Sequence, residues 1–282
     1  MIQPSPEQLA LLRPMERASF RLGDFVARRL KWLSIAWNST FMVGLLWLGS
    51  GRRLKLRGLE HLAKLDRSDS VILVCNHLSF FDFFTVSAVW FRHTPLSRRM
   101  FFPVRAAFFY DSLPGLALNV LLGGMAMFPP VLRDRKRMRF NLYALDRLVA
   151  ELGVPGTGVG IHPEGRRNKT DDPYTLLSAQ SGVGKVALCA KNSKVVPVFM
   201  AGPGNNLAYE FLKNLFMADD NPIDLLFGPP VALDELRDQE MSGSIQREAT
   251  QRCMASIQEL ADEARAIAAA RERAGQTSLV AE

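Results

Sequence analysis

A histidine followed five positions later by an aspartate, His77 and Asp82, could carry out acid–base chemistry in this chain. Both lie in the segment NHLSFFD, directly after the apolar, β-branched run at 71–75, which is typical of a buried strand. The carboxylate would hold one imidazole nitrogen as N–H and leave the other free to take a proton from a hydroxyl. Because residues five apart lie about 140° apart around a helix, we expect His77 in the turn before a helix and Asp82 in its first turns. The same spacing also fits a capped helix start with a surface histidine.

A glycine turn with a carboxylate and two arginines forms a second polar segment, HPEGRRN at 162–168. It follows a short apolar run that we expect to be a strand. The planar guanidinium of an arginine such as Arg167 suits phosphate because it makes paired, charge-assisted hydrogen bonds. A basic run at 131–140 adds Arg133 and Arg135, although such a run is also typical of a solvated face. These arginines are therefore candidates for phosphate binding.

The composition favours lipid over nucleic acid as the partner. The 282 residues carry a formal net charge of +7 and include 18 phenylalanines and 4 tryptophans. A basic, aromatic chain suits either nucleic acid or an anionic membrane surface. No base-stacking aromatic pattern interleaves the basic run, and its neighbours are apolar, so we expect no nucleic acid partner. Three scattered cysteines without C-x-x-C spacing indicate neither a disulfide framework nor a zinc site.

The first 53 residues are expected to associate with a membrane. Residues 1–31 alternate apolar and basic side chains, as an amphipathic helix does, and they carry no secretory signal. Residues 32–50 are long enough to span a bilayer, but Asn38, Ser39 and Thr40 interrupt the apolar run. The tryptophans and the basic flanks favour an interfacial or re-entrant segment, with a single span or a soluble core helix as alternatives. We therefore expect the protein at the cytoplasmic face of a membrane.

The rest of the chain alternates strand-like and helix-like segments, which predicts an α/β fold. We expect strands within 54–62, 71–75, 100–109, 157–165 and 194–202, the last interrupted by Pro197, and helices at 83–91, 140–152, 181–192, 207–217 and 243–273. This order indicates a mixed, largely parallel sheet flanked by helices, with a membrane-associating N-terminal helical segment and a long C-terminal helix. We divide the chain into a membrane-associating segment at 1–53, a catalytic domain at 54–240, and a C-terminal helix with a frayed tail at 241–282.

The order of the polar motifs resembles that of the glycerolipid acyltransferase family, whose type members acylate lysophosphatidic acid. The resemblance covers about residues 70–200 and rests on four ordered blocks. The first block falls on Asn76, His77 and Asp82, and the second on 132–135, where Arg135 takes the phosphate-binding place and Arg133 is its rival. The third falls on 162–168, with the PEG-x-R pattern, and the fourth on the V-P-V strand at 196–198.

The resemblance implies an O-acyltransferase that moves a fatty acyl group from acyl-CoA or acyl-carrier protein to the hydroxyl of 1-acylglycerol-3-phosphate in phospholipid synthesis. In that reaction His77 would be the general base, Asp82 would orient it, and Glu164 would hold the loop or bind the acceptor. The turn at Gly165 could give backbone N–H donors to the tetrahedral oxyanion. The expected substrate-binding residues are Asn76, Arg105, Arg133, Arg135, Gly165 and Arg167. We expect no metal and no cofactor besides the acyl donor.

Several departures from the family pattern leave the acceptor open. His162 replaces the usual phenylalanine, where we expect it to pack rather than act as a second base, and Arg166 replaces the usual threonine. The Phe-Lys-x-Gly signature appears at 179–182 without its lysine. One alternative is an acyltransferase of the same fold that acts on a lyso-aminolipid, a glycerol phosphate or a glycolipid. The other is a catalytically silent lipid-binding protein. The oligomeric state is also left open.

Overall fold

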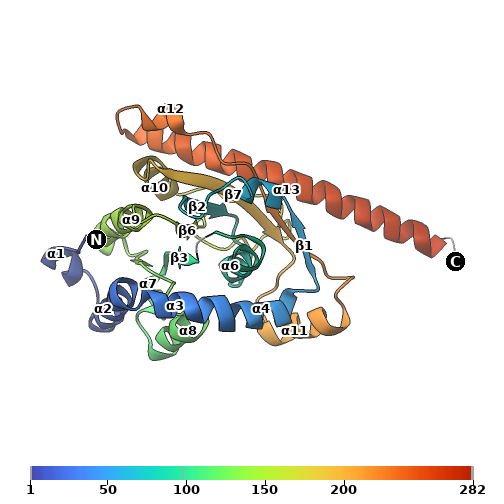
Figure 1. Ribbon diagram of the computed structural model, residues 1–282, viewed down its shortest axis with the longest axis horizontal. Coiled ribbons are helices and arrows are strands. Elements are labelled where there is room, and N and C mark those ends of the chain that lie inside the picture. Colours follow the sequence, from blue (N-terminus) through green and yellow to red (C-terminus); the bar gives the residue numbers. More distant parts are fainter. Residues whose placement is uncertain (1, 97, 281–282) are drawn as a thin grey trace.

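A six-stranded sheet forms the centre of the computed structural model, which describes residues 2–96 and 98–280 (Figure 1). Its strand order is β1-β8-β7-β2-β6-β3, and every neighbouring pair is parallel except β7 and β8. The strands are β1 (Leu54–Arg57), β2 (Ser70–Cys75), β3 (Arg99–Phe101), β6 (Thr157–Ile161), β7 (Ser193–Ala201) and β8 (Ile223–Phe227). A separate parallel pair joins β4 (Val104–Arg105) to β5 (Pro130–Val131). The predicted mixed, largely parallel sheet is therefore confirmed.

Alternation along β2 divides the apolar interior into two layers. Ile72 and Val74 point into a core that also holds side chains of α9 (Arg139–Leu152), α10 (Gly182–Cys189) and α13 (Gly243–Val280). The alternate residues of β2, namely Val71, Leu73 and Cys75, point into a second core that also holds side chains of α6 (Asp82–His93). Successive side chains of a strand face opposite sides, so a strand that is apolar at every position must be covered on both. Figure 1 shows this, with α10 and α13 on one side of the sheet and α6 on the other.

Shorter helices and the N-terminal helices complete the fold. These elements are α1 (Pro6–Ala10), α2 (Pro14–Arg29), α3 (Lys31–Trp37), the π-helix η1 (Asn38–Met42), α4 (Val43–Ser50), α5 (Leu59–Leu62), α7 (Ala106–Phe109), α8 (Leu113–Gly123), the 3-10 helix η2 (Arg135–Arg137), α11 (Leu207–Phe216) and α12 (Asp234–Arg237). The helices predicted at 83–91, 140–152 and 207–217 correspond to α6, α9 and α11.

Two details of the predicted elements are wrong. Strand β7 runs through Pro197 without a break, because its antiparallel pairing with β8 begins only at Val198, so the missing N–H removes no bond of that ladder. The C-terminal helix α13 continues to Val280 and so includes most of the expected frayed tail, of which 281–282 lie outside the described residues.

Residues 32–50 form a continuous helical segment made of α3, η1 and α4. The polar residues that interrupt its apolar run lie in the π-helical part, where Asn38 donates hydrogen bonds to the carbonyls of Ser34 and Gly123. The indole N–H of Trp37 donates to Leu121, also in α8. Among the described residues, no helix combines the length and the apolarity needed to cross a bilayer.

Candidate active site

The catalytic turn begins where β2 ends. Asn76 is buried, and its side-chain amide both donates to the carbonyl of Met200 and accepts from the N–H of Met200, at 2.9 and 2.8 Å. These two bonds tie the end of β2 to β7. Asn76 was expected among the substrate-binding residues; the structure gives its amide a role in holding the backbone, and a contact with substrate stays a prediction.

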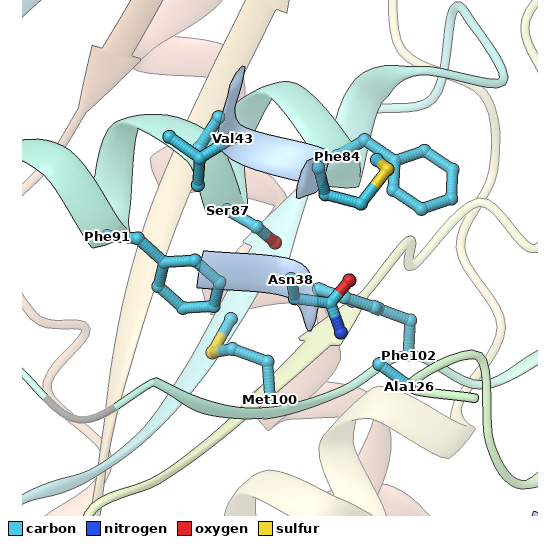
Figure 2. Close-up of a pocket in the computed structure, with 10 residues that line it drawn as sticks. Asn38, Val43, Phe84, Ser87, Phe91, Met100, Phe102 and Ala126 are labelled. Atoms are coloured by element: carbon cyan, nitrogen blue, oxygen red, sulfur yellow. The ribbon is translucent and has the colours of Figure 1, made fainter. Parts of the chain in front are cut away.

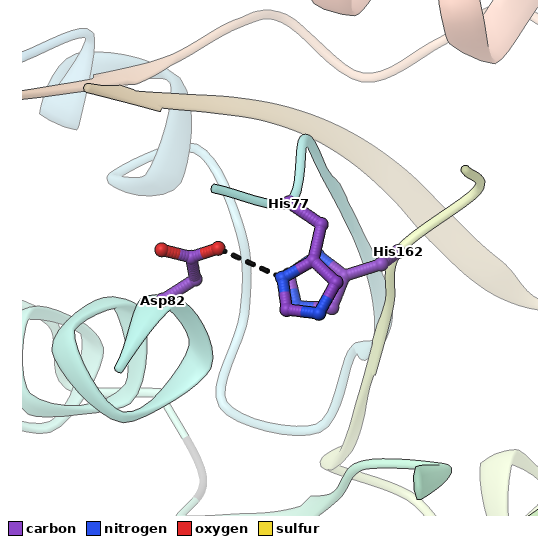
Figure 3. A group of neighbouring side chains, drawn as sticks. All are labelled: His77, Asp82 and His162. Carbon is purple, nitrogen blue, oxygen red and sulfur yellow. Dashed lines mark hydrogen bonds and ion pairs between the residues drawn. The ribbon is translucent and has the colours of Figure 1, made fainter. Parts of the chain in front are cut away.

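His77 and Asp82 meet as the spacing requires. His77 lies in the turn before α6, Asp82 is the first residue of that helix, and His77 Nδ1 lies 3.0 Å from Asp82 Oδ2 (Figure 3). The carboxylate also accepts the backbone N–H groups of Leu78 and Ser79, so it is fixed from three directions. An ionised carboxylate only accepts hydrogen bonds, so Nδ1 carries the proton and Nε2 is left as the basic nitrogen. This is the arrangement of a base with its orienter.

Electrostatics keep His77 neutral and ready to accept a proton. Burial, together with the positive charges of Arg167 and Arg133, lowers the pKa of His77 to about 4. Burial raises the pKa of Asp82 to about 6, although the charge of His162, the N–H groups of Ser79 and Leu78, and Arg167 act in the opposite direction. Near neutral pH the pair is therefore a neutral imidazole beside a carboxylate.

Glu164 positions the catalytic turn. The strands β2 and β6 are parallel neighbours, so the residues that follow them emerge at the same edge of the sheet. The buried carboxylate of Glu164 accepts the N–H of His77 at 3.0 Å and that of Leu177 at 2.9 Å. The N–H of Asn168 donates to the carbonyl of His77. Glu164 thus joins two loops through their backbones, and of its two expected roles the structure favours holding the loop.

The N–H of Gly165 is already used within its own turn. Gly165 has a φ of +65°, a left-handed conformation that suits glycine, and its N–H already donates to the carbonyl of His162 at 3.0 Å. Its carbonyl accepts a hydrogen bond from the guanidinium of Arg133. The N–H of Gly165 itself is therefore occupied, and the expectation that another N–H group of this turn meets the oxyanion stays a prediction.

Arg133 and Arg167 lie close enough to His77 to lower its pKa, and Arg105 and Arg166 lie close to Arg133. Arg133 contacts the Gly165 turn, and its pKa is lowered by partial burial and by the positive charges of Arg105 and Arg166. Arg167 donates to the side-chain oxygen of Asn205 at 2.7 Å. In the part of the chain that the structure describes, no carboxylate forms an ion pair with any of these four arginines. Such a concentration of positive charge without ion pairs is suited to an anionic ligand.

Arg135 lies apart from this group. It is the exposed first residue of η2, and no hydrogen bond or ion pair among the described residues joins its side chain to the catalytic loops. Of the two rivals in the basic run, Arg133 is the one that the structure brings to the site. Asn205 was missed in the sequence, although it connects Arg167 to the N–H of Phe80. Its only signal was its position a few residues after the end of β7.

His162 packs against His77, as expected of a residue in the place of a phenylalanine. The two rings are stacked, with centroids 3.8 Å apart and planes 9° apart (Figure 3). The ring of Phe83 also contacts His162, with centroids 4.0 Å apart. Its Nδ1 lies 3.0 Å from the carbonyl of Cys75, and burial with the charge of His77 lowers its pKa to about 3. His77, Asp82 and His162 each place a possible metal-ligand atom within 4.8 Å of the others. Stacked, nearly parallel rings direct their lone pairs side by side, so this cluster does not converge on one ion.

A cluster of aromatic side chains lies between the catalytic turn and the N-terminal helices. Phe80 contacts Phe84 and Phe109, with ring centroids 5.4 and 5.9 Å apart. These rings belong to a third apolar cluster with residues of η1, α4 and α8, including Met42 and Leu46. Figure 2 shows a neighbouring cavity between η1 and α6, but its free volume of about 10 Å³ holds roughly one water molecule, not a hydrocarbon chain.

The comparisons with known proteins agree with this geometry. A family model described as acyltransferase matches residues 53–201, which is slightly more than half of the chain. The matched segment contains the catalytic turn, the Glu164 loop and strands β1 to β7. None of the curated proteins compared with the chain matches it. The paired base and orienter at the end of β2 thus lie within a chain that belongs to the acyltransferase family.

Proposed function

We propose that this protein is a membrane-associated acyltransferase that moves a fatty acyl group from acyl-CoA or acyl-carrier protein to the hydroxyl of 1-acylglycerol-3-phosphate. One observation carries the proposal of a phosphorylated acceptor. Arg133 and Arg167 lie near a neutral His77 that is paired with Asp82, and Arg105 and Arg166 lie near Arg133. Among the described residues, no ion pair joins these four arginines to a carboxylate. A phosphate monoester carries the charge that this group lacks, and its attached glycerol would place a hydroxyl near the base.

In the proposed reaction, His77 Nε2 removes the proton of the acceptor hydroxyl while the oxygen attacks the thioester carbonyl carbon. The tetrahedral intermediate collapses, the carbon–sulfur bond breaks, and the leaving thiolate takes the proton from the imidazolium. Asp82 stabilises the transient positive charge on the ring through its bond to Nδ1. General-base help of this kind typically contributes about 10²–10⁴ in rate.

Phosphate binding would also strengthen the base. The charges of Arg167 and Arg133 lower the pKa of His77 in the free protein. A phosphate dianion between these arginines would offset their charge, so the pKa of His77 would rise when the acceptor binds. Arg133 and Arg167 would thus bind the acceptor and also adjust the base to it.

Membrane association is supported by the apolar surface of the N-terminal helices. Trp32 on α3, Phe41 on η1 and Leu48 on α4 are exposed, and exposed arginines such as Arg29 and Arg52 flank this segment. Apolar and aromatic side chains beside basic ones suit the headgroup layer of an anionic membrane. The aromatic cluster around Phe80 lies between this segment and the catalytic turn, where it could contact the acyl chains.

A second acceptor class is kept open by particular residues. Arg166 adds a positive charge next to Arg133, and the segment 179–182 lacks the usual lysine, so the anionic group need not be the phosphate of a lysophosphatidic acid. An acyltransferase for a lyso-aminolipid or a glycolipid would use the same His77 and Asp82 but a different set of headgroup contacts.

The test is thioester release measured with a panel of acceptors in lipid vesicles, for the wild type and for Arg133→Ala. Lysophosphatidic acid is compared with monoacylglycerol, which has the same acyl glycerol without phosphate. We expect turnover with the phosphorylated acceptor and a raised KM for it in the variant. Equal turnover with both acceptors, or an unchanged KM in Arg133→Ala, would overturn the phosphate assignment and favour the other acceptor class.

A further inference from the structure

Helix α11 carries two polar residues inward and most of its large apolar residues outward, with Phe211, next to Gly49 of α4, as the exception. Glu210 and Asn214 are each only 5 % exposed. Leu212 and Phe216 are 52 % and 74 % exposed, and Tyr209, Leu215 and Met217 are also on the outside. The sequence predicts an amphipathic helix here, and such a helix on a soluble domain normally turns its apolar stripe to the core. The reversed orientation leaves a contiguous apolar face that the described chain does not cover.

The polar face of α11 is locked onto the end of α4. Glu210 pairs with the fully buried guanidinium of Arg53, with 2.5 Å between Oε2 and Nη1. The amide of Asn214 accepts the N–H of Arg52 and donates to the carbonyl of Leu48. Turning the apolar face inward would expose one member of the Arg53–Glu210 pair and leave the other buried without a counter-charge, at a large energetic cost. The outward direction of the apolar face is therefore fixed by the fold.

The apolar face of α11 extends a surface that includes the N-terminal helices and α8. Helix α11 packs against α4, and α8 packs against η1. Figure 1 shows α8 and α11 next to α3 and α4, on the side of the molecule away from α13. Several large apolar side chains are exposed along these elements, namely Trp32, Leu33, Phe41, Leu48, Leu113, Val120 and Leu121.

Basic groups accompany this apolar face. The exposed Arg52 donates to the carbonyl of Leu215, so its guanidinium lies on the surface of α11, and the ammonium of Lys213 lies 4.7 Å from the ring of Tyr209. Asp219 and Asp220 in the turn after the helix offset part of this charge. Apolar insertion should therefore supply most of the binding, with anionic headgroups as a smaller addition.

The start of α11 is joined to the catalytic site. The hydroxyl of Ser79, next to the catalytic turn, donates to the carbonyl of Gly204. Asn205 accepts from the N–H of Phe80 and from Arg167, and Asn206 then caps α11 by accepting the N–H of Tyr209. Three consecutive residues thus run from the arginine group to the first turn of the helix. Whatever α11 contacts is fixed in position relative to His77.

We infer that α11 is a lipid-facing element whose outer side, formed by Tyr209, Leu212, Leu215 and Phe216, inserts into the headgroup layer of an anionic bilayer. In this arrangement the helix presents the His77 site to acceptors that lie in the membrane surface. The inference rests on the proposed function, because a lipid acceptor is what makes this placement useful. It adds α11 to the N-terminal helices as a second element that contacts the membrane.

The test compares two double variants of the full chain. Leu212→Glu/Phe216→Glu places charges on the proposed lipid face, and Leu142→Glu/Met241→Glu places them on exposed apolar residues of α9 and of the segment before α13. Sedimentation with vesicles of phosphatidylcholine and phosphatidylglycerol measures membrane binding. Thioester turnover with a short-chain, water-soluble lysophosphatidic acid measures folding and chemistry independently of the membrane.

The α11 variant should lose about tenfold or more in vesicle partitioning, because it replaces two inserted apolar side chains by charges. The control variant should partition like the wild type, and all three proteins should turn over the soluble acceptor. Unchanged partitioning of the α11 variant would overturn the inference. A shift from dimer to monomer at unchanged partitioning would overturn it as well and assign the face to contacts between copies. Partitioning that depends on α11 without any turnover would instead defeat the proposed function and leave the lipid-facing role of α11 standing.

Discussion

Two groups of arginines in this protein differ in whether a carboxylate faces them. In the first group, Arg147 pairs with Asp24 and Glu151, and Arg137 pairs with Glu16. In the second group, Arg133 and its three neighbours around His77 have no such partner among the described residues.

The two groups differ because one is buried and the other is exposed. Arg147 is fully buried, and a buried charge is tolerated only when it is paired and hydrogen-bonded. Its bonds to α2 and within α9 hold the N-terminal helices on the catalytic domain. Arg133 and Arg167 lie at the surface, where water stabilises their charge. The buried pairs thus support the fold, and the exposed arginines near His77 are the ones that we propose for the acceptor.

The largest effect on this contrast should come from Arg147→Ala. Removing this side chain leaves Glu151 buried with one counter-charge fewer, so we expect unfolding in urea to require about 3–5 kcal/mol less free energy. The exposed Arg139→Ala on the same helix is the matched control and should stay within about 0.5 kcal/mol of the wild type. A comparable loss of unfolding free energy in both variants would show that the ion pairs of Arg147 do not stabilise the fold more than an exposed arginine does.

Arg133→Ala should have the opposite profile. Losing a charge-assisted contact of about 1.5–3 kcal/mol should raise the KM for a phosphorylated acceptor about 10–100-fold, while stability in urea changes little. Arg135→Ala is the control from the same basic run, and its KM should remain close to that of the wild type. If Arg135→Ala gave the larger rise in KM, the phosphate site would lie on η2, and Arg135 rather than Arg133 would be the phosphate ligand.

Arg167→Gln should move the pH profile. The charge of Arg167 lowers the pKa of both His77 and Asp82, so removing it raises both. The protonated, inactive form of the pair then persists to higher pH, and the acid limb of kcat/KM shifts upward by up to about one pH unit. Initial rates across pH at low acceptor concentration measure this shift. A downward shift would mean that Arg167 acts on the pair in some other way than through its charge.

The smallest effect is expected for His162→Phe. A phenylalanine keeps the stacking over His77 and the contact with Phe83, and it loses the hydrogen bonds to the backbone of Cys75 and Asn76. We expect kcat within about threefold of the wild type, which corresponds to less than about 1 kcal/mol. His162→Ala, which removes the stacking ring, should be the slower of the two variants. A loss of kcat in His162→Phe as large as that of a missing base would assign His162 to proton transfer.

The sequence was sufficient for most strands of the sheet and for the possible pairing of His77 with Asp82, but it gave no prediction of β8. Local signals carry these features, namely the apolar run of β2, the turn residues after it, and a spacing that permits His77 and Asp82 to meet only across the start of a helix. The strand order was not predictable in the same way. Strand β8 lies between β1 and β7 and is antiparallel to β7, and nothing in its five residues encodes which neighbour it pairs with.

The contacts of individual side chains within a motif could not be predicted from the sequence either. Arg133, Arg135 and Arg137 belong to one basic run, yet one contacts the Gly165 turn, one is exposed on η2, and one pairs with Glu16. Which of them meets a carboxylate depends on where α2 packs, which is a long-range contact. The outward apolar face of α11 was hidden for the same reason, because the periodicity of a helix reveals a stripe but not the direction in which tertiary contacts turn it.

The central claim is that His77 is the base of an acyl transfer to a phosphorylated lipid. The most direct measurement is thioester release in lipid vesicles with lysophosphatidic acid, with the wild type beside His77→Ala at equal amounts of folded protein. We predict turnover by the wild type and a loss of about 10²–10⁴ in the variant, because the acceptor hydroxyl then lacks its proton acceptor. Full turnover by His77→Ala would contradict the account.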